Sequence, residues 1–489
     1  MSELTSGNGE NKRKTTRFYT IVAVTMALMC LFGFLPPFGQ ITPDGMKVLG
    51  VFIGCIFAWS MGELLWPSIL ALVILALQGS GTVAGNYATA FGNQMSALII
   101  ASLVICFAIE RCGLLTEIAK WVITRKFAQR NLWNLALAFF ITAAVGGALM
   151  SNSLPPTIIL WALFYETARH LGLKPYERFT SIVLIGIVVI GYSGSTIMPY
   201  SMMGALSISL SKTMDPAFMI NNLYYIGVNL ALNIVFIPMA YLFLRFVLRP
   251  SVNVEMIQRE PHRIVFTKRM KWVALYLILL IVVMVVPNLL PAGNSINTFF
   301  AVKLGNIGVL ITLPVLMMLT RTEGESIVDI GEALSKGIPW GLVLLVSAAM
   351  TVGGAITAEA TGIMPTIVAG LSPILAGKSA AMVVIIFCIV GLVVTNAVND
   401  LVTITVLLPI AYNFVVEAGG NPIFLTAMMA PACVQGCFLP SGSVLGALMH
   451  GNGEWLKSKD VYKYVFLLEA VLAVAFTIFN IIYTNVTHY

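Results

Sequence analysis

Nine apolar runs follow one another along this 489-residue chain, and most are long enough to cross a lipid bilayer. A helix that spans a membrane needs about 20 apolar residues. The runs lie at residues 18–36, 46–65, 67–83, 96–112, 222–248, 272–291, 298–319, 339–357 and 461–485. Inside hydrocarbon the backbone must satisfy its own hydrogen bonds, so a run of this kind forms a helix. The sequence therefore predicts an all-α polytopic membrane protein.

The composition argues against several other classes of protein. Hydrophobic residues make up 58% of the chain and charged residues only 10%, whereas soluble domains carry about 25% charged residues. The net charge is +7, but the basic residues lie in short stretches between apolar runs, so nucleic-acid binding is not expected. The seven cysteines have no CxxC spacing and there is no HExxH motif. We therefore expect no metal, no cofactor and no enzymatic activity.

Four further apolar stretches are less regular. Stretches 132–166 and 380–416 can each form a helical hairpin that need not cross the membrane. Stretches 180–210 and 423–449 have the pattern of helices broken in the middle. With the nine runs, they predict about eleven full crossings and two re-entrant hairpins.

A short polar segment interrupts each expected hairpin, and a helix break follows 45 residues later. The first hairpin tip lies at 151–156 and is matched by a break near 194–201. The second tip lies at 395–400 and is matched by a break near 438–446. Interrupted apolar segments at matching places in two halves indicate the substrate site of a secondary transporter.

An internal repeat divides the chain into halves at 18–249 and 272–489, joined by a polar linker at 250–271. Segment 108–114 resembles segment 357–363 at an offset of 249 residues, and the two tips are offset by 244 residues. The expected number of crossings between the halves is odd, so we expect the repeat to be inverted.

Basic residues predict the orientation of the chain. Segment 1–17 and the linker 250–271 are rich in Lys and Arg, so the positive-inside rule puts both in the cytoplasm. No Lys or Arg follows Lys463, and we expect the C-terminus outside. The first apolar run has no small-residue cleavage signal, which predicts a retained helix. The expected location is the cytoplasmic membrane of a bacterium, with lipid around the helices.

The two tips carry the chemistry expected of an anion site. A helix that starts at a tip exposes unpaired N–H groups and the positive end of its dipole, and such helix ends favour anions. The candidate substrate-binding residues are Ser151, Asn152, Ser153, Thr196, Pro199, Thr395, Asn396, Ala397, Gly442 and Ser443. Two half-sites suit a molecule with an anionic group at each end, such as a dicarboxylate. The alternative is that these polar residues only hold neighbouring helices together.

Asp400 is a rare carboxylate in an apolar stretch, and charges inside a membrane indicate function by default. It could bind a cation, relay a proton, or pair with a base such as His450 or Lys303. A purely structural partner for Asp400 is an equally good interpretation. His450 follows the second break, and we name His450 and Asp400 as candidates for charge compensation.

At these residues the chain resembles the divalent anion:sodium symporter family of dicarboxylate and citrate carriers. The resemblance covers nearly the whole chain, and it includes the segments 59–63, 109–114, 337–340 and 407–410 and the Ser-Asn-Thr-like tips at 151–153 and 395–397. It implies a homodimer in which a transport region holding the tips and broken helices moves as an elevator against a scaffold region.

The chain also departs from that family. Sodium-coupled members carry Ser/Thr-Pro-Pro-Asn in each broken helix, and neither loop here has this pattern. Ala397 also stands where the family has a third tip hydroxyl. Since the family includes sodium-independent exchangers, we expect an exchanger for four- or five-carbon dicarboxylates. A sodium- or proton-coupled dicarboxylate or citrate symporter is the alternative.

Overall fold

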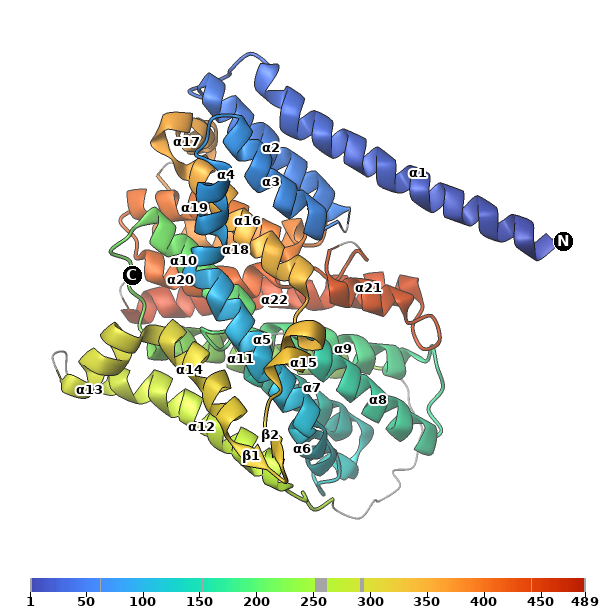
Figure 1. Ribbon diagram of the computed structural model, residues 1–489. Coiled ribbons are helices and arrows are strands. Elements are labelled where there is room, and N and C mark those ends of the chain that lie inside the picture. The colour runs from blue at the N-terminus through green and yellow to red at the C-terminus, as the bar shows by residue number, and fades with distance from the viewer. Residues whose placement is uncertain are drawn as a thin grey trace. The chain divides into compact units, whose positions relative to one another are not determined.

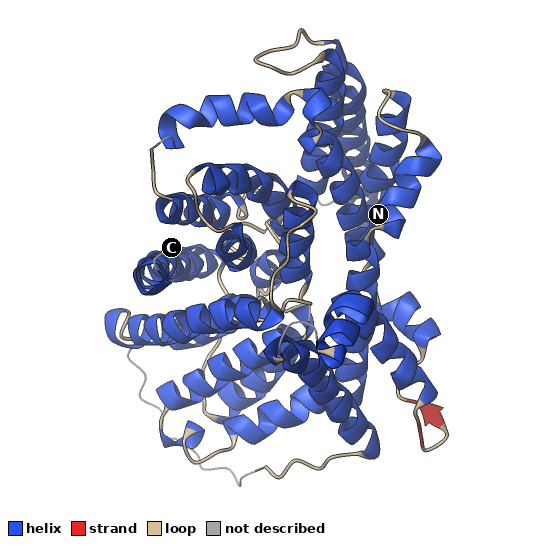
Figure 2. Ribbon diagram, turned by 90° about the vertical axis from the view of Figure 1, so that its left-hand side faces the viewer, coloured by secondary structure: helices blue, strands red, loops and turns tan. Residues whose placement is uncertain are grey.

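The computed structural model describes residues 2–61, 63–150, 153–250, 262–290, 294–375, 377–440 and 442–487. These residues are helical almost throughout, with one short β-hairpin (Figure 2). The chain forms two compact units, each of which contains two separate stretches of sequence. The first unit comprises Met1–Ser96 and Trp340–Ala376, and the second comprises Ala97–Pro339 and Gly377–Tyr489. Both units therefore draw on both sequence halves.

Eight helices in the described residues are long and apolar enough to cross a membrane. The number rises to ten if each of two bent helix pairs counts as one span. The all-α membrane fold predicted from the sequence is thereby confirmed. The number of about eleven crossings, the inverted sense of the repeat and the orientation of the termini stay predictions.

The first unit contains the early helices and two later ones (Figure 1). Its elements are α1 (Ser2–Leu31), α2 (Pro43–Ser60), α3 (Leu65–Leu77), α4 (Val83–Gly92), α16 (Trp340–Thr357) and α17 (Ile363–Leu375), with 3₁₀ turns at Phe32–Phe34 and Glu359–Thr361. Thr42 caps α2 by accepting a 3.1 Å hydrogen bond from the Gly45 N–H, and Pro43 suits the first helical position. Buried hydroxyls of Ser96 and Ser347 lie 2.7 Å apart.

The second unit contains the remaining elements. They are α5 (Gln94–Cys112), α6 (Leu114–Ile123), α7 (Leu132–Leu149), α8 (Leu154–His170), α9 (Arg178–Ser195), α10 (Met202–Met214), α11 (Asn222–Leu242), α12 (Lys268–Leu289), α13 (Ser295–Asn297), α14 (Gly305–Leu319), β1 (Arg321–Thr322), β2 (Glu325–Ser326), α15 (Ile330–Glu332), α18 (Ala380–Val394), α19 (Asp400–Glu417), α20 (Pro422–Cys433), α21 (Val444–Gly451) and α22 (Ser458–Thr487). A 3₁₀ turn lies at Ala128–Arg130, and π-helical segments lie at Phe243–Val247, Thr298–Leu304 and Ala333–Gly337. Strands β1 and β2 pair antiparallel, with Arg321 opposite Ser326.

Two series of helices in the second unit have the same order. In the first, helices α7 and α8 are followed by α9, α10 and the long α11. In the second, α18 and α19 are followed by α20, α21 and the long α22. Helix α9 packs against α7 and α22, and α20 packs against α18 and α11. Each series therefore contacts the long helix of the other.

Backbone conformation supports the internal repeat. Gly113 and Gly362 occupy equivalent places in the repeated segments 108–114 and 357–363. Both are left-handed, with φ of 70° and 66°, a conformation that glycine adopts without steric cost. Each is followed at once by a helix, α6 or α17. The two segments thus resemble each other in conformation as well as in sequence.

Helix α12 presents an apolar stripe to its surroundings. Leu275, Ile278, Val282 and Val286 recur every three or four residues, and each is more than two-fifths exposed. A continuous apolar face of this kind is costly in water and is what a lipid-facing helix requires. The stripe therefore supports placing α12 in the bilayer.

Close contact between α7 and α9 depends on glycine. A Cβ atom on Gly194 would lie 2.4 Å from the Ala144 carbonyl oxygen and 2.6 Å from the Ala144 Cα. Because these are backbone atoms, the clash cannot be relieved by turning a side chain. A Cβ atom on Gly191, one helical turn earlier, would meet Ala143 only at 3.7 Å, an ordinary contact.

Replacing Gly194 by Ala is expected to push α9 off α7 and to lower the free energy of unfolding by about 1–3 kcal/mol. The matched variant Gly191→Ala, on the same helix, is expected to change it little. Thermal unfolding of the two purified variants in detergent measures the difference. Equal unfolding temperatures for both variants would show that the backbone contact at Gly194 is not as close as described.

The described part of the linker begins at His262 and is tied to α6. The Nε2 atom of His262 lies 2.7 Å from Glu117 Oε2, and the backbone N–H of His262 donates to Thr124 Oγ1 at 2.9 Å. The hydrogen bond with His262 holds the pKa of the Glu117 carboxyl below its usual value, with further lowering by the nearby Lys120 and some opposition from desolvation. The stabilisation from this hydrogen bond is fully present at pH values above the pKa of Glu in the unfolded chain. It is lost as the pH falls through the lower pKa of Glu117 in the folded protein.

Acidification is therefore expected to loosen this end of the linker. Amide exchange at His262, corrected for the intrinsic rate, should quicken as the pH falls through the folded-state pKa of Glu117. Glu117→Gln should show the faster exchange already at neutral pH, whereas Glu325→Gln at an exposed strand position should not. Unchanged protection in Glu117→Gln would contradict the assignment.

Candidate functional site

The second hairpin tip is built around one hydroxyl group. Thr395 is fully buried at the end of α18, and its Oγ1 lies 2.7 Å from Asp400 Oδ1. The same Oγ1 lies 2.6 Å from the Cys433 carbonyl oxygen. The Gly436 N–H also donates to Asp400 Oδ1, at 3.2 Å. Asp400, the first residue of α19, is thus joined to the tip through Thr395 and to the broken helix through Gly436.

Asn396 uses all of its polar atoms within the protein. Its Nδ2 donates to the Leu392 carbonyl oxygen and to Glu469 Oε2, each at 2.8 Å. Its Oδ1 accepts from the Phe438 N–H at 2.7 Å. The two backbone partners fix which end of the amide is which. In this conformation the Asn396 side chain therefore has no free N–H for a substrate.

Glu469 on α22 is a member of the site that the sequence analysis did not single out. Its side chain is buried, and its Oε1 has no hydrogen-bond partner among the described residues. The signal was present in the sequence, because Glu469 is an acidic residue in the middle of the apolar run 461–485. An isolated carboxylate in such a run indicates function for the same reason as Asp400 does.

The second break lets the backbone of the broken helix lie directly on the tip. A Cβ atom on Gly436 would lie 2.3 Å from Asp400 Oδ1, and one on Gly442 would lie 2.9 Å from the Asn396 carbonyl oxygen. Ser443 then caps α21, since its Oγ accepts from the Gly446 N–H at 3.0 Å. Gly442 and Ser443, two of the predicted site residues, are both buried beside the tip.

The first break is capped in the same way. Ser201 Oγ accepts from the Gly204 N–H at 3.2 Å, so α10 and α21 both begin with a Ser-x-x-Gly cap. Thr196 and Pro199 lie buried between α9 and α10. Thr196 Oγ1 donates to the Ser193 carbonyl oxygen at 2.8 Å. Both interrupted helices therefore restart from a serine that satisfies an otherwise unpaired N–H.

The first tip is described only from Ser153 onward. Ser151 and Asn152, two predicted site residues, lie outside the described residues. Ser153 is buried, and its hydroxyl donates to the Gly191 carbonyl oxygen on α9 at 3.3 Å. Pro155 and Pro156 occupy the first turn of α8, where a missing N–H costs nothing. From Ser153 onward, the first tip thus packs against α9, as the second packs against the break after α20.

Buried amides connect the two series of helices. Asn229 on α11 donates to the Ala427 carbonyl oxygen on α20 at 3.2 Å, and its Oδ1 lies 3.4 Å from Thr196 Oγ1. Gln435, just after α20, donates to the Val189 carbonyl oxygen on α9 at 3.5 Å. Tyr192 on α9 faces both Asp400 and Ser443. Asn229 and Gln435 were not among the residues predicted for the site, because a single amide in an apolar run does not show which helix it will meet.

His450 lies near the second break, beside the backbone of Phe438. Its Nε2 lies 3.0 Å from the Phe438 carbonyl oxygen, and its ring packs against Tyr462. Among the described ion pairs, none involves Asp400 or Glu469. Two carboxyl groups, those of Asp400 and Glu469, thus lie at the second tip, and charge compensation by His450 stays a prediction. Ala397, another predicted site residue, is exposed at the tip.

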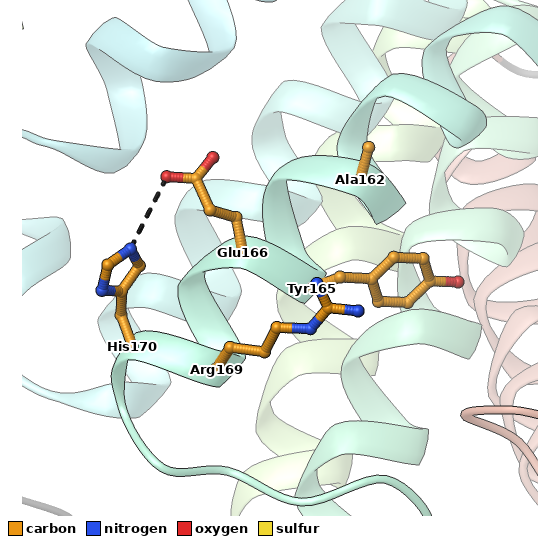
Figure 3. Close-up of a pocket in the computed structure, with 5 residues that line it drawn as sticks. All are labelled: Ala162, Tyr165, Glu166, Arg169 and His170. Carbon is orange, nitrogen blue, oxygen red and sulfur yellow. Dashed lines mark ion pairs between the residues drawn. The ribbon is translucent and has the colours of Figure 1, made fainter.

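A separate polar pocket of about 440 Å³ lies along the end of α8 (Figure 3). Its lining residues are Ala162, Tyr165, Glu166, Arg169 and His170. Glu166 and His170 form an ion pair of 3.9 Å with both side chains about three-fifths exposed, an arrangement that contributes little. Tyr165 accepts a 2.7 Å hydrogen bond from Asn452 Nδ2 and stacks on Trp455. These contacts anchor α8 to the loop after α21.

The arrangement as a whole suits the binding of an anion. The N-termini of α10, α19 and α21 lie at interruptions next to buried hydroxyls and amides. Helix N-termini carry partial positive charge, so they can stabilise carboxylates without a bound cation. Among the described residues, no group of three or more His, Cys, Asp or Glu side chains could hold a metal ion.

Comparisons with known proteins place this fold among membrane transporters. No protein-family model matches the chain. The chain resembles the solved YdaH transporter of Alcanivorax borkumensis, with a TM-score of 0.58 over 91% of this chain and 98% of that one. It also resembles MtrF of Neisseria gonorrhoeae, described with a class of antimetabolite efflux pumps, with a TM-score of 0.55 over 94% and 96%. Both are 12% identical to the chain, so this likeness shows the fold alone.

A more specific similarity comes from a curated sequence. The chain is 21% identical over 436 residues to the sodium-dependent dicarboxylate transporter SdcS of Staphylococcus saprophyticus. The aligned region covers 84% of this chain and 82% of that protein. The protein is thus a multi-pass membrane protein with a transporter fold, and it is similar to a dicarboxylate transporter over most of its length.

The hydrogen bond between Asn396 and Glu469 can be tested by two substitutions. Glu469→Ala removes the acceptor and leaves a buried N–H of Asn396 without a partner, which costs about 1–3 kcal/mol. Glu469→Gln keeps an acceptor oxygen of similar reach and should cost clearly less. Thermal unfolding in detergent compares the two variants. If Ala and Gln destabilise equally, the acceptor at this position does not hold Asn396.

Proposed function

We propose that the protein is a secondary transporter of four- or five-carbon dicarboxylates, of the succinate, malate or 2-oxoglutarate type, and that it works by exchange. The observation that carries the substrate class is the similarity to a dicarboxylate transporter across 84% of the chain. The proposal extends the relative's substrate class to this chain.

The geometry supports a substrate with two anionic ends. Each hairpin tip lies against backbone near its matching break, and both breaks restart with a serine cap. In the proposed complex, one substrate carboxylate lies at the first tip, near Ser151, Asn152 and Ser153. The other lies at the second tip, near Asn396 and the N-terminus of α19. Carboxylates at helix N-termini gain hydrogen bonds and a favourable dipole interaction together.

Asn396 needs a change of partner to bind substrate. Its Nδ2 already donates to a carboxylate, that of Glu469, so a substrate carboxylate offers the same chemistry. We propose that substrate replaces Glu469 as the acceptor. Glu469 would then occupy the amide while the substrate site is empty, and the hydrogen bond would transfer to substrate on binding.

Exchange is proposed over sodium coupling because of the loops at the breaks. Neither loop carries the Ser/Thr-Pro-Pro-Asn pattern of sodium-coupled carriers. A sodium- or proton-coupled dicarboxylate or citrate symporter is the alternative, and the name of the similar relative makes sodium the first cation to test. A homodimer with an elevator motion and a cytoplasmic N-terminus belongs to the same proposal.

Purified protein in liposomes tests the proposal directly. Vesicles loaded with unlabelled succinate are expected to take up labelled succinate from outside, with or without sodium. Vesicles without internal dicarboxylate should take up little, because the empty carrier does not return. Competition by malate, 2-oxoglutarate, tartrate and citrate then defines the accepted length and charge.

The controls separate the transport mode from the substrate class. Protein-free vesicles measure leakage, and Asn396→Ala is expected to raise the KM for succinate by at least about tenfold through loss of a charge-assisted hydrogen bond. Uptake into empty vesicles that depends on a sodium gradient would replace exchange by symport. Absence of succinate uptake under every condition would overturn the dicarboxylate assignment itself.

A further inference from the structure

An apolar groove with a volume of about 690 Å³ lies between α11 and α22. Both helices belong to the second unit. Every lining side chain is apolar, and Leu242, Phe246 and Val474 in its wall are each about half exposed. The wall includes residues of the π-helical segment Phe243–Val247, and π-helical turns often mark functional sites. The groove thus offers a fitted surface to hydrocarbon, whereas contact with water is unfavourable there.

The two helices run antiparallel, and this fixes the ends of the groove. The hydroxyl groups of Tyr224, near the start of α11, and Tyr483, near the end of α22, form a hydrogen bond. The end of α11 therefore lies beside the start of α22. Along the chain, the first wall of the groove ends at Val247 and the second begins at Leu467. These two residues thus lie at the same end of the groove.

Basic residues gather at this end of the groove. Arg245 and Arg249 lie within and just after the first wall. On α22, Lys463 precedes Leu467 by four residues, a spacing that puts both side chains on the same face of a helix. Asp460 lies three residues before Lys463 and offsets one of these charges, which leaves a net positive charge. The groove is therefore apolar along its length and basic at one end.

Both arginines are held against Phe246, a residue of the groove wall. The guanidinium carbon of Arg245 lies 5.0 Å from the centroid of the Phe246 ring, and Arg245 Nη1 donates to the Tyr241 hydroxyl at 2.7 Å. Arg249 Nε donates to the Phe246 carbonyl oxygen at 2.6 Å. A guanidinium group has five N–H donors, and these hydrogen bonds use one in each arginine. Among the described ion pairs, none involves either arginine or Lys463.

We propose that the groove binds one acidic phospholipid, whose acyl chain lies between α11 and α22 and whose phosphate is held by Arg245, Arg249 and Lys463. Guanidinium groups bind phosphate through charge-assisted, often bidentate hydrogen bonds. The basic linker 250–271 follows Arg249 directly, so the positive-inside rule predicts this end of the groove at the cytoplasmic face. Anionic lipid headgroups attract basic residues at that face. This lipid site goes beyond the proposed transport function and does not depend on it.

An acidic phospholipid fits the groove better than other occupants do. A free anion would contact the basic residues and leave the apolar wall uncovered. A second copy of the chain, related by a two-fold axis along the membrane normal, would bring its own basic residues to the same level, where like charges repel each other. A lipid with an anionic headgroup matches both the apolar wall and its basic end.

Native mass spectrometry of the purified full chain measures this binding. The probes are phosphatidylglycerol and phosphatidylcholine with identical acyl chains, titrated in detergent. Each basic residue near a membrane surface contributes roughly fivefold to the affinity for an anionic headgroup. Wild-type protein should therefore prefer phosphatidylglycerol by at least about 25-fold, and Arg245→Gln/Arg249→Gln should lose about 25-fold of this affinity. The matched variant Arg263→Gln/Lys271→Gln, at exposed basic residues that do not line the groove, should bind as the wild type does.

A second pair of variants tests the apolar wall. Ala470→Trp puts an indole ring into the groove and should weaken the binding of both lipids by at least about tenfold, the loss expected when two acyl methylenes leave the wall. Ile481→Trp, at a half-exposed position of α22 outside the groove, should leave the binding of both lipids unchanged.

Equal affinity of the wild-type protein for the two lipids, or unchanged phosphatidylglycerol binding in the double arginine variant, would overturn the lipid site. Displacement of the lipid by an equal concentration of glycerol 3-phosphate would overturn it too, because the basic residues would then take a free phosphate. A loss of oligomer mass in Ala470→Trp would show that the groove is an interface between copies of the chain instead. Absence of succinate counterflow would overturn the proposed function and leave the lipid site unaffected.

Discussion

Every peptide group that leaves a helix inside the apolar interior needs another hydrogen-bond partner, and this constraint organises the second unit. Two hairpins and two broken helices interrupt the regular pattern, so four sets of backbone groups lose their helical partners. The chain meets the need locally where it can, with Ser201 and Ser443 as N-caps. Where it cannot, side chains from other helices supply the partners, as Asn396 does for the Phe438 N–H. The groups that hold the interruptions together are therefore also the polar groups available to a ligand.

This double use explains why the second tip is so fully bonded. An unpaired polar group in a dry interior costs more than a made hydrogen bond contributes, so the tip must be satisfied when no ligand is present. Thr395, Asn396 and Asp400 achieve this with partners on α18, α20, α22 and the break after α20. A ligand can enter such a site only by replacing a protein partner of similar chemistry. The carboxylate of Glu469 is such a partner, because it presents to Asn396 what a dicarboxylate would present.

Much of this arrangement could be predicted from the sequence, because hydrocarbon penalises polarity and helix breaks so strongly. Apolar length alone indicated a helical membrane fold, and the resemblance of segments 108–114 and 357–363 extends to the left-handed Gly113 and Gly362. The partners of the tips could not be predicted. Glu469 lies 73 residues from Asn396 along the chain, and only packing determines which of the many helices faces a given tip. For the same reason, the two compact units cut across the sequence halves in a way that no local pattern records.

The placement of charge bears on how this chain could carry the dicarboxylate that we propose as its substrate. A dicarboxylate brings two negative charges to a site that already contains Asp400 and Glu469, and moving each charge through a membrane potential costs about 2.3 kcal/mol per 100 mV. Helix N-termini offset part of this energetic cost by stabilising the bound carboxylates, but they do not change the net charge that moves across the membrane. The described ion pairs supply no fixed positive charge at the tip, and the loops lack the sequence typical of sodium-coupled carriers. At this tip a dicarboxylate would therefore rely on helix N-termini and neutral donors for its stabilisation.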